Sequence, residues 1–359
     1  MKKIDIYIIR KFLGTFFFAL GLIITIAIVF DLSEKMDDFI DKNAPFKAVV
    51  IDYYFNFIPY FANLFSGLFV FISVIFFTSK MAQNSEFIAI LSNGVSFKRI
   101  LLPYFIGATI ITGFSFVLGN FVIPDANRVR LEFQSQYFKG SGYSIGAIDL
   151  HRQISPGVYM YIESYNLPRN IGYHLTLEQF ENNELISKLG ADNMVWDSVN
   201  NTWILQNYYL RTFDGLKENL VQGNRIDTAI NITPGEFTRQ KYLVETMNRQ
   251  ELDEHIAKQL MMGAPEVVNS ELEKYNRIAT PFSTFILTMI GVTLSARKRK
   301  GGMGLNIGVG ILLSFSYVLF QRFASMFAIS NTFHASFAVW IPNILYAIIA
   351  IGLYFSAPK

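Results

Sequence analysis

Six segments of this chain are long and apolar enough to cross a lipid bilayer as helices. A hydrocarbon core of about 30 Å needs about 20 mainly apolar residues in helical form, because a backbone amide without a hydrogen-bond partner is too costly in lipid. The predicted spans lie at residues 12–30, 53–79, 100–123, 278–296, 304–327 and 337–355. Three spans therefore precede a long polar region, and three follow it.

The composition agrees with a membrane protein and excludes one large class of ligand. Hydrophobic residues make up 52% of the chain and charged residues only 16%, and the hydrophobic residues crowd into both ends of the sequence. The net charge is only +3, and the basic residues stand beside apolar segments instead of forming one basic face. We therefore expect no binding of nucleic acid.

Catalytic, metal and nucleotide sites have no sequence signature in this chain. The absence of cysteine excludes disulfides and thiolate metal sites. A glycine-rich loop ending in Lys-Ser or Lys-Thr, which would bind nucleotide phosphates, is missing. The four histidines are scattered without metal-ligand spacing, at His151, His174, His255 and His334. We expect a non-enzymatic chain that binds no metal and no cofactor.

The basic residues near the spans predict the orientation of the chain. Lysine and arginine beside a span are retained on the cytoplasmic side. Residues 31–52, which follow the first span, are net acidic, and residues 328–336 contain no lysine or arginine. The basic residues precede the first span or join spans two to three and four to five: Lys2, Lys3, Arg10, Lys11, Lys80, Lys98, Arg99, Arg297, Lys298, Arg299 and Lys300. We predict that both termini are cytoplasmic and that the central region lies outside the cytoplasm.

The central region changes from helical to strand-like periodicity. Apolar and polar residues alternate at 158–164, 173–180 and 202–211, which predicts half-buried strands in an antiparallel sandwich or jelly roll. A helical pattern returns afterwards, with Leu252, Ile256 and Leu260 forming one apolar stripe until residues 263–265 break it. The predicted domains are residues 1–123 (first three spans), 124–240 (strand-rich domain), 241–276 (helical connector) and 277–359 (last three spans).

The predicted cytoplasmic loop at about residues 84–94 has the pattern of a short amphipathic helix. Ser85 and Glu86 are suited to cap the helix, and Gly94 is suited to end it. The apolar face would consist of Phe87, Ile88, Ile90 and Leu91. Periodicity alone favours a helix lying in the lipid headgroup layer. The alternative is a coupling helix that docks in a groove of an ATPase subunit, with Glu86 meeting a basic residue.

Three stretches resemble one family of membrane proteins. The sequence Ser-Glu-Phe-Ile-Ala-Ile-Leu-Ser-Asn-Gly-Val-Ser at residues 85–96 resembles the coupling segment of the lipopolysaccharide-export permeases, the LptF/LptG family. Val-Phe-Asp at residues 29–31 is similar to the G member, and residues 271–281 resemble the family's entry into the fourth span. The order of three spans, a periplasmic β-jellyroll and three spans is also that of the family. The chain looks more like the G member than the F member.

The resemblance implies a function and a set of partners. Two such permeases take lipopolysaccharide from the bacterial inner membrane, and a cytoplasmic ABC ATPase dimer supplies the energy from ATP. The jellyroll passes the lipid to a periplasmic β-jellyroll bridge protein for export to the outer membrane. The ATPase contact would be Glu86, and the supporting residues would be Ser85, Leu91 and Gly94. Lipopolysaccharide and the surrounding membrane lipid would be the non-protein partners.

A phosphorylated lipid would require cations near the outer surface of the membrane. Intramembrane charges are often functional, but an arginine also snorkels to the interface or pairs inside a bundle, and a loop lysine is often only solvated. The basic residues at suitable predicted depth are Lys35, Arg128, Arg130, Arg277 and Arg322. These five are the candidate contacts of the lipid phosphates.

Two other functional classes remain open from the residues alone. A secondary transporter places ionisable groups near the bilayer midplane, and the midplanes of these spans are nearly uncharged. A membrane-anchored sensor or scaffold would use the outer domain for binding and would carry a cytoplasmic signalling domain, whereas this chain has only short loops there. An ATPase partner would separate the permease from both classes.

Overall fold

The computed structural model describes residues 2–138, 148–166, 169–182, 184–198, 200–215, 217–230, 232–237, 244–296 and 302–356. The chain divides into two compact units. The helical unit consists of Met1–Tyr137, Glu245–Arg249 and Val268–Lys359. The sheet unit consists of Phe138–Val244 and Gln250–Val267.

All six predicted spans are confirmed as helices that are long and apolar enough to cross a membrane. The first span lies in α1 (Lys3–Asp41) and the second in α3 (Phe55–Gln83), which continues from α2 (Phe46–Ala48) and the π-helix η1 (Val49–Tyr54). The third lies in α5 (Phe97–Val117), which continues through the π-helix η2 (Leu118–Val122) into α6 (Ile123–Tyr137). The last three are α8 (Val267–Ser295), α9 (Gly302–Ile329) and α10 (Ala335–Phe355).

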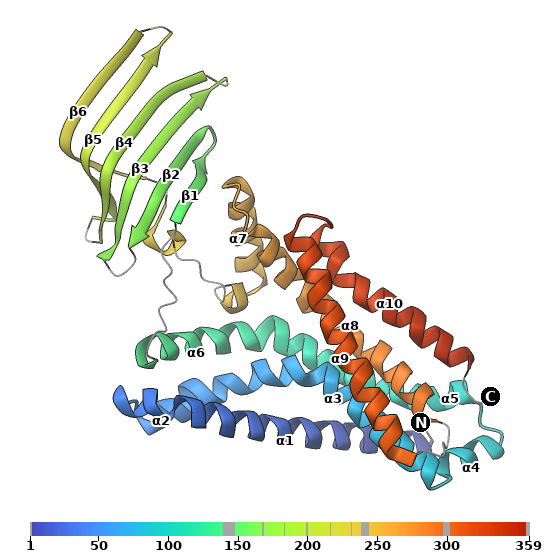
Figure 1. Cartoon of the computed structure of the whole chain (residues 1–359). Coiled ribbons are helices and arrows are strands. Elements are labelled where there is room, and N and C mark those ends of the chain that lie inside the picture. The colour runs from blue at the N-terminus through green and yellow to red at the C-terminus, as the bar shows by residue number, and fades with distance from the viewer. Residues whose placement is uncertain are drawn as a thin grey trace. The chain divides into compact units, whose positions relative to one another are not determined.

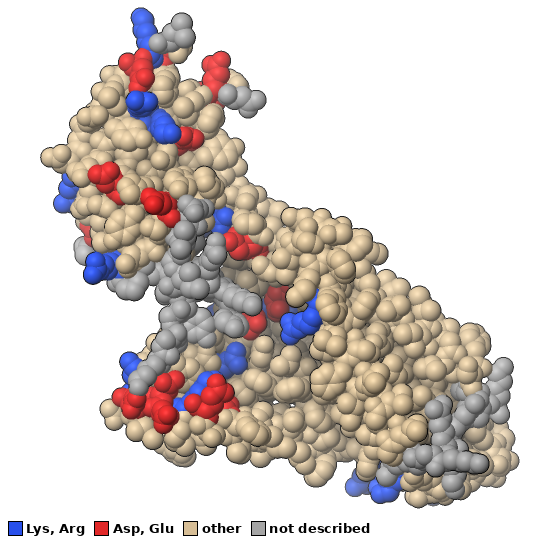
Figure 2. Space-filling view, viewed as in Figure 1, with Lys and Arg blue, Asp and Glu red and all other residues tan. Residues whose placement is uncertain are grey.

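The helices are longer than the hydrocarbon core requires. With 39 residues, α1 is about 58 Å long, so its two ends extend beyond a bilayer core of about 30 Å. Figure 2 shows a broad uncharged surface over the helices, with basic and acidic side chains gathered towards the helix ends. The functional side chains described below lie at these two ends.

The central helix of the helical unit is α3, which packs against α1, α6 and α9 (Figure 1). Successive residues of a helix point about 100° apart, so α3 serves two cores with neighbouring faces. Val70 and Val74 belong to the core formed with α1 and α5. Phe71 and Ile75 belong to the core formed with α8, α9 and α10. This arrangement explains why α3 is apolar on most of its circumference.

The sheet unit confirms the predicted antiparallel strands. Its six strands form one sheet in the order β1-β2-β3-β4-β5-β6, so each strand pairs with its neighbour in sequence (Figure 1). A jelly roll in the strict sense has two sheets with Greek-key connections, and the strands in the described residues follow the simpler sequential order. The strands are β1 (Ile148–Ser155), β2 (Val158–Asn166), β3 (Ile171–Glu181), β4 (Glu184–Asp197), β5 (Thr202–Asp214) and β6 (Lys217–Thr228).

Hairpin turns and one buried face explain why these strands pair in this register. Asn182 and Asn201 adopt left-handed conformations with φ of 48° and 53°, which short hairpin turns require. On the buried face, Ile162 stands opposite Leu175 and Met194 opposite Leu205. The strand-rich fold therefore follows from the alternation seen in the sequence.

The core of the sheet unit is completed by segments outside the sheet. Ile232 and Phe237, at the 3-10 helix η4 (Pro234–Phe237), pack with the buried Trp203 of β5. The Trp203 indole donates a hydrogen bond of 2.8 Å to the Ile232 carbonyl. Tyr165 stacks on Phe237 with ring centroids 4.3 Å apart, and burial raises the pKa of the Tyr165 phenol to about 12. The Tyr165 hydroxyl therefore stays protonated at neutral pH.

The helix α7 (Arg249–Met261) lies within the predicted connector, residues 241–276, and buries only part of the predicted apolar stripe. Leu252 and Ile256 are buried, whereas Leu260 is 58% exposed. The prediction for Leu260 is wrong because residues spaced by four drift around a helix with 3.6 residues per turn, by about 80° over two steps. Gly263, with a φ of +61°, follows the end of this helix as predicted.

Candidate functional site

The predicted coupling segment forms a separate helix, α4 (Glu86–Ser92). Ser85 precedes it with a φ of 61°, and its side chain makes no capping hydrogen bond. The predicted Ser85 cap is therefore wrong, because a side-chain cap needs an extended backbone at that position and Ser85 is left-handed. Gly94 ends the segment as predicted, with a φ of +76° and its amide donating to the Leu91 carbonyl at 3.0 Å.

The apolar face of α4 packs against the core of the helical unit. Phe87 is completely buried in the core shared by α1, α3 and α5, and its ring lies 6.1 Å from that of Phe97. Ile90 and Leu91 pack against the same core. Ile88, which we predicted on this face, is 47% exposed, because it follows Phe87 by only one residue and points away from the core. The side of α4 that does not face the core exposes Ile88, Ala89 and Ser92, which include both apolar and polar side chains.

The Glu86 carboxylate is held by hydrogen bonds from two directions. One oxygen accepts from the Tyr7 hydroxyl at 3.1 Å, and the other accepts from the Asn84 side-chain amide at 3.1 Å. Tyr7 belongs to the second turn of α1, 79 residues earlier in the chain. The residue that we predicted as the ATPase contact is therefore connected directly to the first membrane span.

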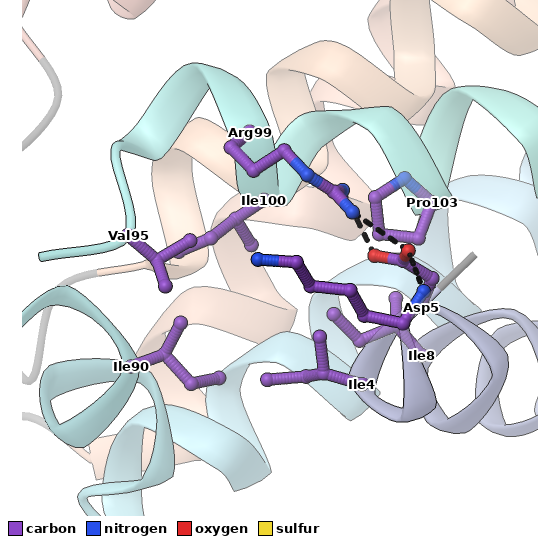
Figure 3. A pocket seen from close by; sticks show the side chains of 9 residues that line it. Ile4, Asp5, Ile8, Ile90, Val95, Arg99, Ile100 and Pro103 are labelled. Atoms are coloured by element: carbon purple, nitrogen blue, oxygen red, sulfur yellow. Dashed lines mark hydrogen bonds and ion pairs between the residues drawn. The ribbon is translucent and has the colours of Figure 1, made fainter. Parts of the chain in front are cut away.

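An ion pair between a buried carboxylate and a partly exposed arginine fixes the start of α1 beside α4. The Arg99 guanidinium of α5 donates to both carboxylate oxygens of Asp5, at 2.8 and 2.7 Å. The Lys2 amide donates to the same carboxylate at 2.7 Å, and Asp5 is only 2% exposed. The pair borders a cavity of about 30 Å³, to which the α4 segment contributes Ile90 and Val95 (Figure 3). A cavity of this size holds about one water molecule.

Sequence reasoning missed the Asp5–Arg99 pair, since we interpreted Arg99 only as a topology signal. The partners lie 94 residues apart, so no local spacing connects them. The available signal was Asp5 itself, a carboxylate among the basic residues that precede the first span. A charge of the opposite sign at a membrane boundary is expected to have a specific partner.

The five candidate lipid contacts lie towards the other end of α1, and two of them are neutralised by carboxylates. Lys35 donates to Asp31 at 2.7 Å and to the Tyr53 hydroxyl at 3.0 Å. Arg277 donates to Glu273 at 2.9 Å and to the Met247 carbonyl at 2.7 Å. A cation that already faces a carboxylate attracts a phosphate less strongly than an unpaired cation does.

The remaining three candidates occupy different environments. Arg128 is exposed and donates to the Thr246 carbonyl at 3.3 Å. Arg130 is 7% exposed and lies over the Tyr60 ring at 4.8 Å, and its buried Nε atom has no hydrogen-bond partner in the part of the chain that the structure describes. Arg322 of α9 is exposed and forms no hydrogen bond or ion pair with any residue that the structure describes.

Tyr60 of α3 contacts one of these arginines and lies near a second. It lies within electrostatic reach of both Arg130 and Arg322, as well as of Glu245 and Glu273. The structure therefore combines α3, α6, α8 and α9 around one mixed-charge group at this end of the helical unit. Within the described ranges, no three His, Asp or Glu side chains are arranged as metal ligands.

Comparison with known proteins extends over nearly the whole chain. Residues 6–355 match the model of a protein family described as the lipopolysaccharide export system permease LptF/LptG. The match covers α1, α4, the sheet and α10, and it does not distinguish the F member from the G member. No curated protein matches the chain. With six membrane-spanning helices around an inserted antiparallel sheet, this multi-pass inner-membrane protein belongs to the LptF/LptG family of lipopolysaccharide export permeases.

Proposed function

We propose that this chain is the permease subunit of an ATP-driven ABC transporter that extracts lipopolysaccharide from the inner membrane and passes it to a periplasmic bridge. ATP would be bound and hydrolysed by a separate cytoplasmic ATPase dimer, and a second homologous permease would complete the transporter. The observation that carries the proposal is α4, which buries Phe87 in the bundle and keeps its opposite side exposed beside Glu86. A helix whose apolar face is covered by its own protein has less apolar surface left to insert into headgroups.

The proposed orientation places α4 and both chain termini in the cytoplasm and the sheet unit in the periplasm. The basic residues beside the first three spans support this orientation, because Lys2, Lys3, Lys80 and Lys98 flank the same helix ends as α4. The outer end of α1, with Lys35, would then face the periplasm. This end is where the phosphates of a lipid in the outer leaflet lie.

Arg130 and Arg322 are the preferred candidates for binding lipid phosphate. Arg322 is exposed, and the buried Nε of Arg130 has no partner among the described residues. Guanidinium groups bind phosphate oxygens through paired hydrogen bonds. Lys35, Arg128 and Arg277 stay predictions as secondary contacts, since each already has a polar partner.

The sheet unit offers a surface for the proposed bridge protein. In the described sheet β6 is an edge strand, and most of its residues are exposed. An exposed edge presents unpaired backbone groups that accept a further strand from a partner. A bridge protein of similar architecture would extend the sheet at such an edge.

The direct test is mass spectrometry of the tagged protein extracted in mild detergent. We expect an ATPase with a phosphate-binding loop, a second permease of similar topology and a glycolipid that contains lipid A. Recovery of only bulk phospholipid, with no ATPase under gentle crosslinking, would contradict the proposal and favour a secondary transporter or a sensor.

Replacing Arg322 by glutamate is expected to reduce the retained glycolipid about tenfold, because a charge-assisted hydrogen bond is replaced by repulsion. The measurement is the ratio of lipid A to permease in the purified complex. Arg322→Lys is the matched control, since it keeps the positive charge at the same position, and we expect it to retain most of the lipid. Equal lipid content in the glutamate variant and the wild type would exclude Arg322 as a phosphate contact.

A further inference from the structure

The carboxylate of Glu86, the proposed ATPase contact, also accepts a hydrogen bond from Tyr7 of α1. The Tyr7 hydroxyl and the Asn84 amide each occupy one carboxylate oxygen, at 3.1 Å in both cases. An ionised carboxylate has about four acceptor positions, so two remain for a further donor. A guanidinium or ammonium group of a partner is the donor that a carboxylate with free acceptor positions binds best.

The Tyr7 hydroxyl is itself held in place by its surroundings. Its ring meets the Phe77 ring of α3 edge to face, with centroids 6.2 Å apart. Two residues earlier, the bidentate Asp5–Arg99 pair ties the first turn of α1 to α5. Tyr7 therefore presents its hydroxyl to Glu86 from a backbone that is anchored on two sides.

A fixed hydroxyl limits the rotation of the Glu86 side chain. A free glutamate at the start of a short helix samples several rotamers, and ordering them on binding costs part of the affinity. Donors that hold the carboxylate in one orientation remove part of that cost before the partner arrives. The hydrogen bond also connects α4 to the first membrane span without an intervening loop.

We propose that Tyr7 is a positioning residue of the docking site, whose hydroxyl orients the Glu86 carboxylate towards a cationic side chain of the ATPase. This inference rests on the proposed docking of an ATPase at α4. Asp5 and Arg99 support it by fixing the first turn of α1, directly before Tyr7. The first span is thereby a direct structural partner of the coupling helix.

The test is a double-mutant cycle on the affinity of the ATPase. The two-permease complex is purified in detergent, immobilised and titrated with the purified cytoplasmic ATPase. Four versions are compared: wild type, Tyr7→Phe, Glu86→Ala and the double variant. Tyr7→Phe keeps the ring contact with Phe77 and removes only the hydroxyl. Tyr354→Phe is the matched control, since the Tyr354 ring contacts Phe97 and its hydroxyl forms no hydrogen bond with a described residue.

We expect Tyr7→Phe to weaken ATPase binding about three- to tenfold, which corresponds to the loss of one hydrogen bond, and Tyr354→Phe to leave binding unchanged. In the Glu86→Ala background, Tyr7→Phe should have no further effect. An equal loss in both backgrounds would show that the hydroxyl acts through general stability and would overturn the inference, as would wild-type binding of Tyr7→Phe. If Glu86→Ala itself binds normally, the proposed docking role of Glu86 fails and the inference fails with it.

Discussion

Glu86→Lys is expected to abolish recruitment of the ATPase, lowering its affinity by about 100-fold or more. The substitution replaces the anion that the docking site presents with a cation, so a basic side chain of the partner meets repulsion instead of a hydrogen-bonded charge. It also leaves the Tyr7 hydroxyl and the Asn84 amide without the carboxylate that accepts from both. The measurement is the amount of ATPase that co-purifies with the tagged permease complex.

The matched control for this charge reversal is Glu132→Lys. Glu132 is exposed on α6, far along the helical unit from α4, and its side chain forms no hydrogen bond with a described residue. We expect this variant to recruit ATPase normally. A Glu86→Lys protein that inserts into the membrane and still carries wild-type amounts of ATPase would refute the docking role.

Trp203→Ala is expected to destabilise the sheet unit by about 3–5 kcal/mol. The Trp203 ring is completely buried, contacts the rings of Trp196 and Phe237, and donates its indole hydrogen to the Ile232 carbonyl. The substitution leaves a cavity in the core and an unpaired carbonyl. A loss of this size is comparable to the total stability of many small domains.

Amide hydrogen exchange of the purified full-length protein measures this effect. We expect faster exchange throughout β4 and β5 in Trp203→Ala, with unchanged exchange in the membrane-spanning helices. Leu220→Ala is the control, because Leu220 lies on β6 with 47% of its surface exposed and its truncation should change stability by less than about 0.5 kcal/mol. Protection of β5 at the wild-type level would contradict the assigned role of Trp203 in the core.

Local patterns were sufficient to predict the elements of this fold. The cost of an unpaired amide in lipid depends only on the residues of one segment, so apolar length alone predicted the six spans that the structure confirms. Strand alternation likewise depends on near neighbours, and it predicted the antiparallel strands that the structure confirms. The helix α4 and its end at Gly94 were likewise predicted from the local sequence.

The predictions that failed are those in which the tertiary structure determines the direction of a side chain. Ser85 comes two residues after the end of α3 and has a left-handed backbone, so it does not cap α4. Ile88 and Leu260 belong to apolar patterns, but the helices bury other faces. Periodicity identifies the residues that share a face, whereas packing decides how far that face extends.

The sequence by itself determined the class of the protein, the number and order of its spans, the strand-rich insertion and the short helix between the second and third spans, because each depends on interactions within one segment. The tertiary structure alone decided which charges meet. Asp5 pairs with Arg99 across 94 residues, and Tyr7 bonds to Glu86 across 79. Lys35 and Arg277 are neutralised, while Arg322 makes no polar contact with the described residues. Charge pairing acts over a few ångströms of space, so the two partners follow no regular spacing along the sequence.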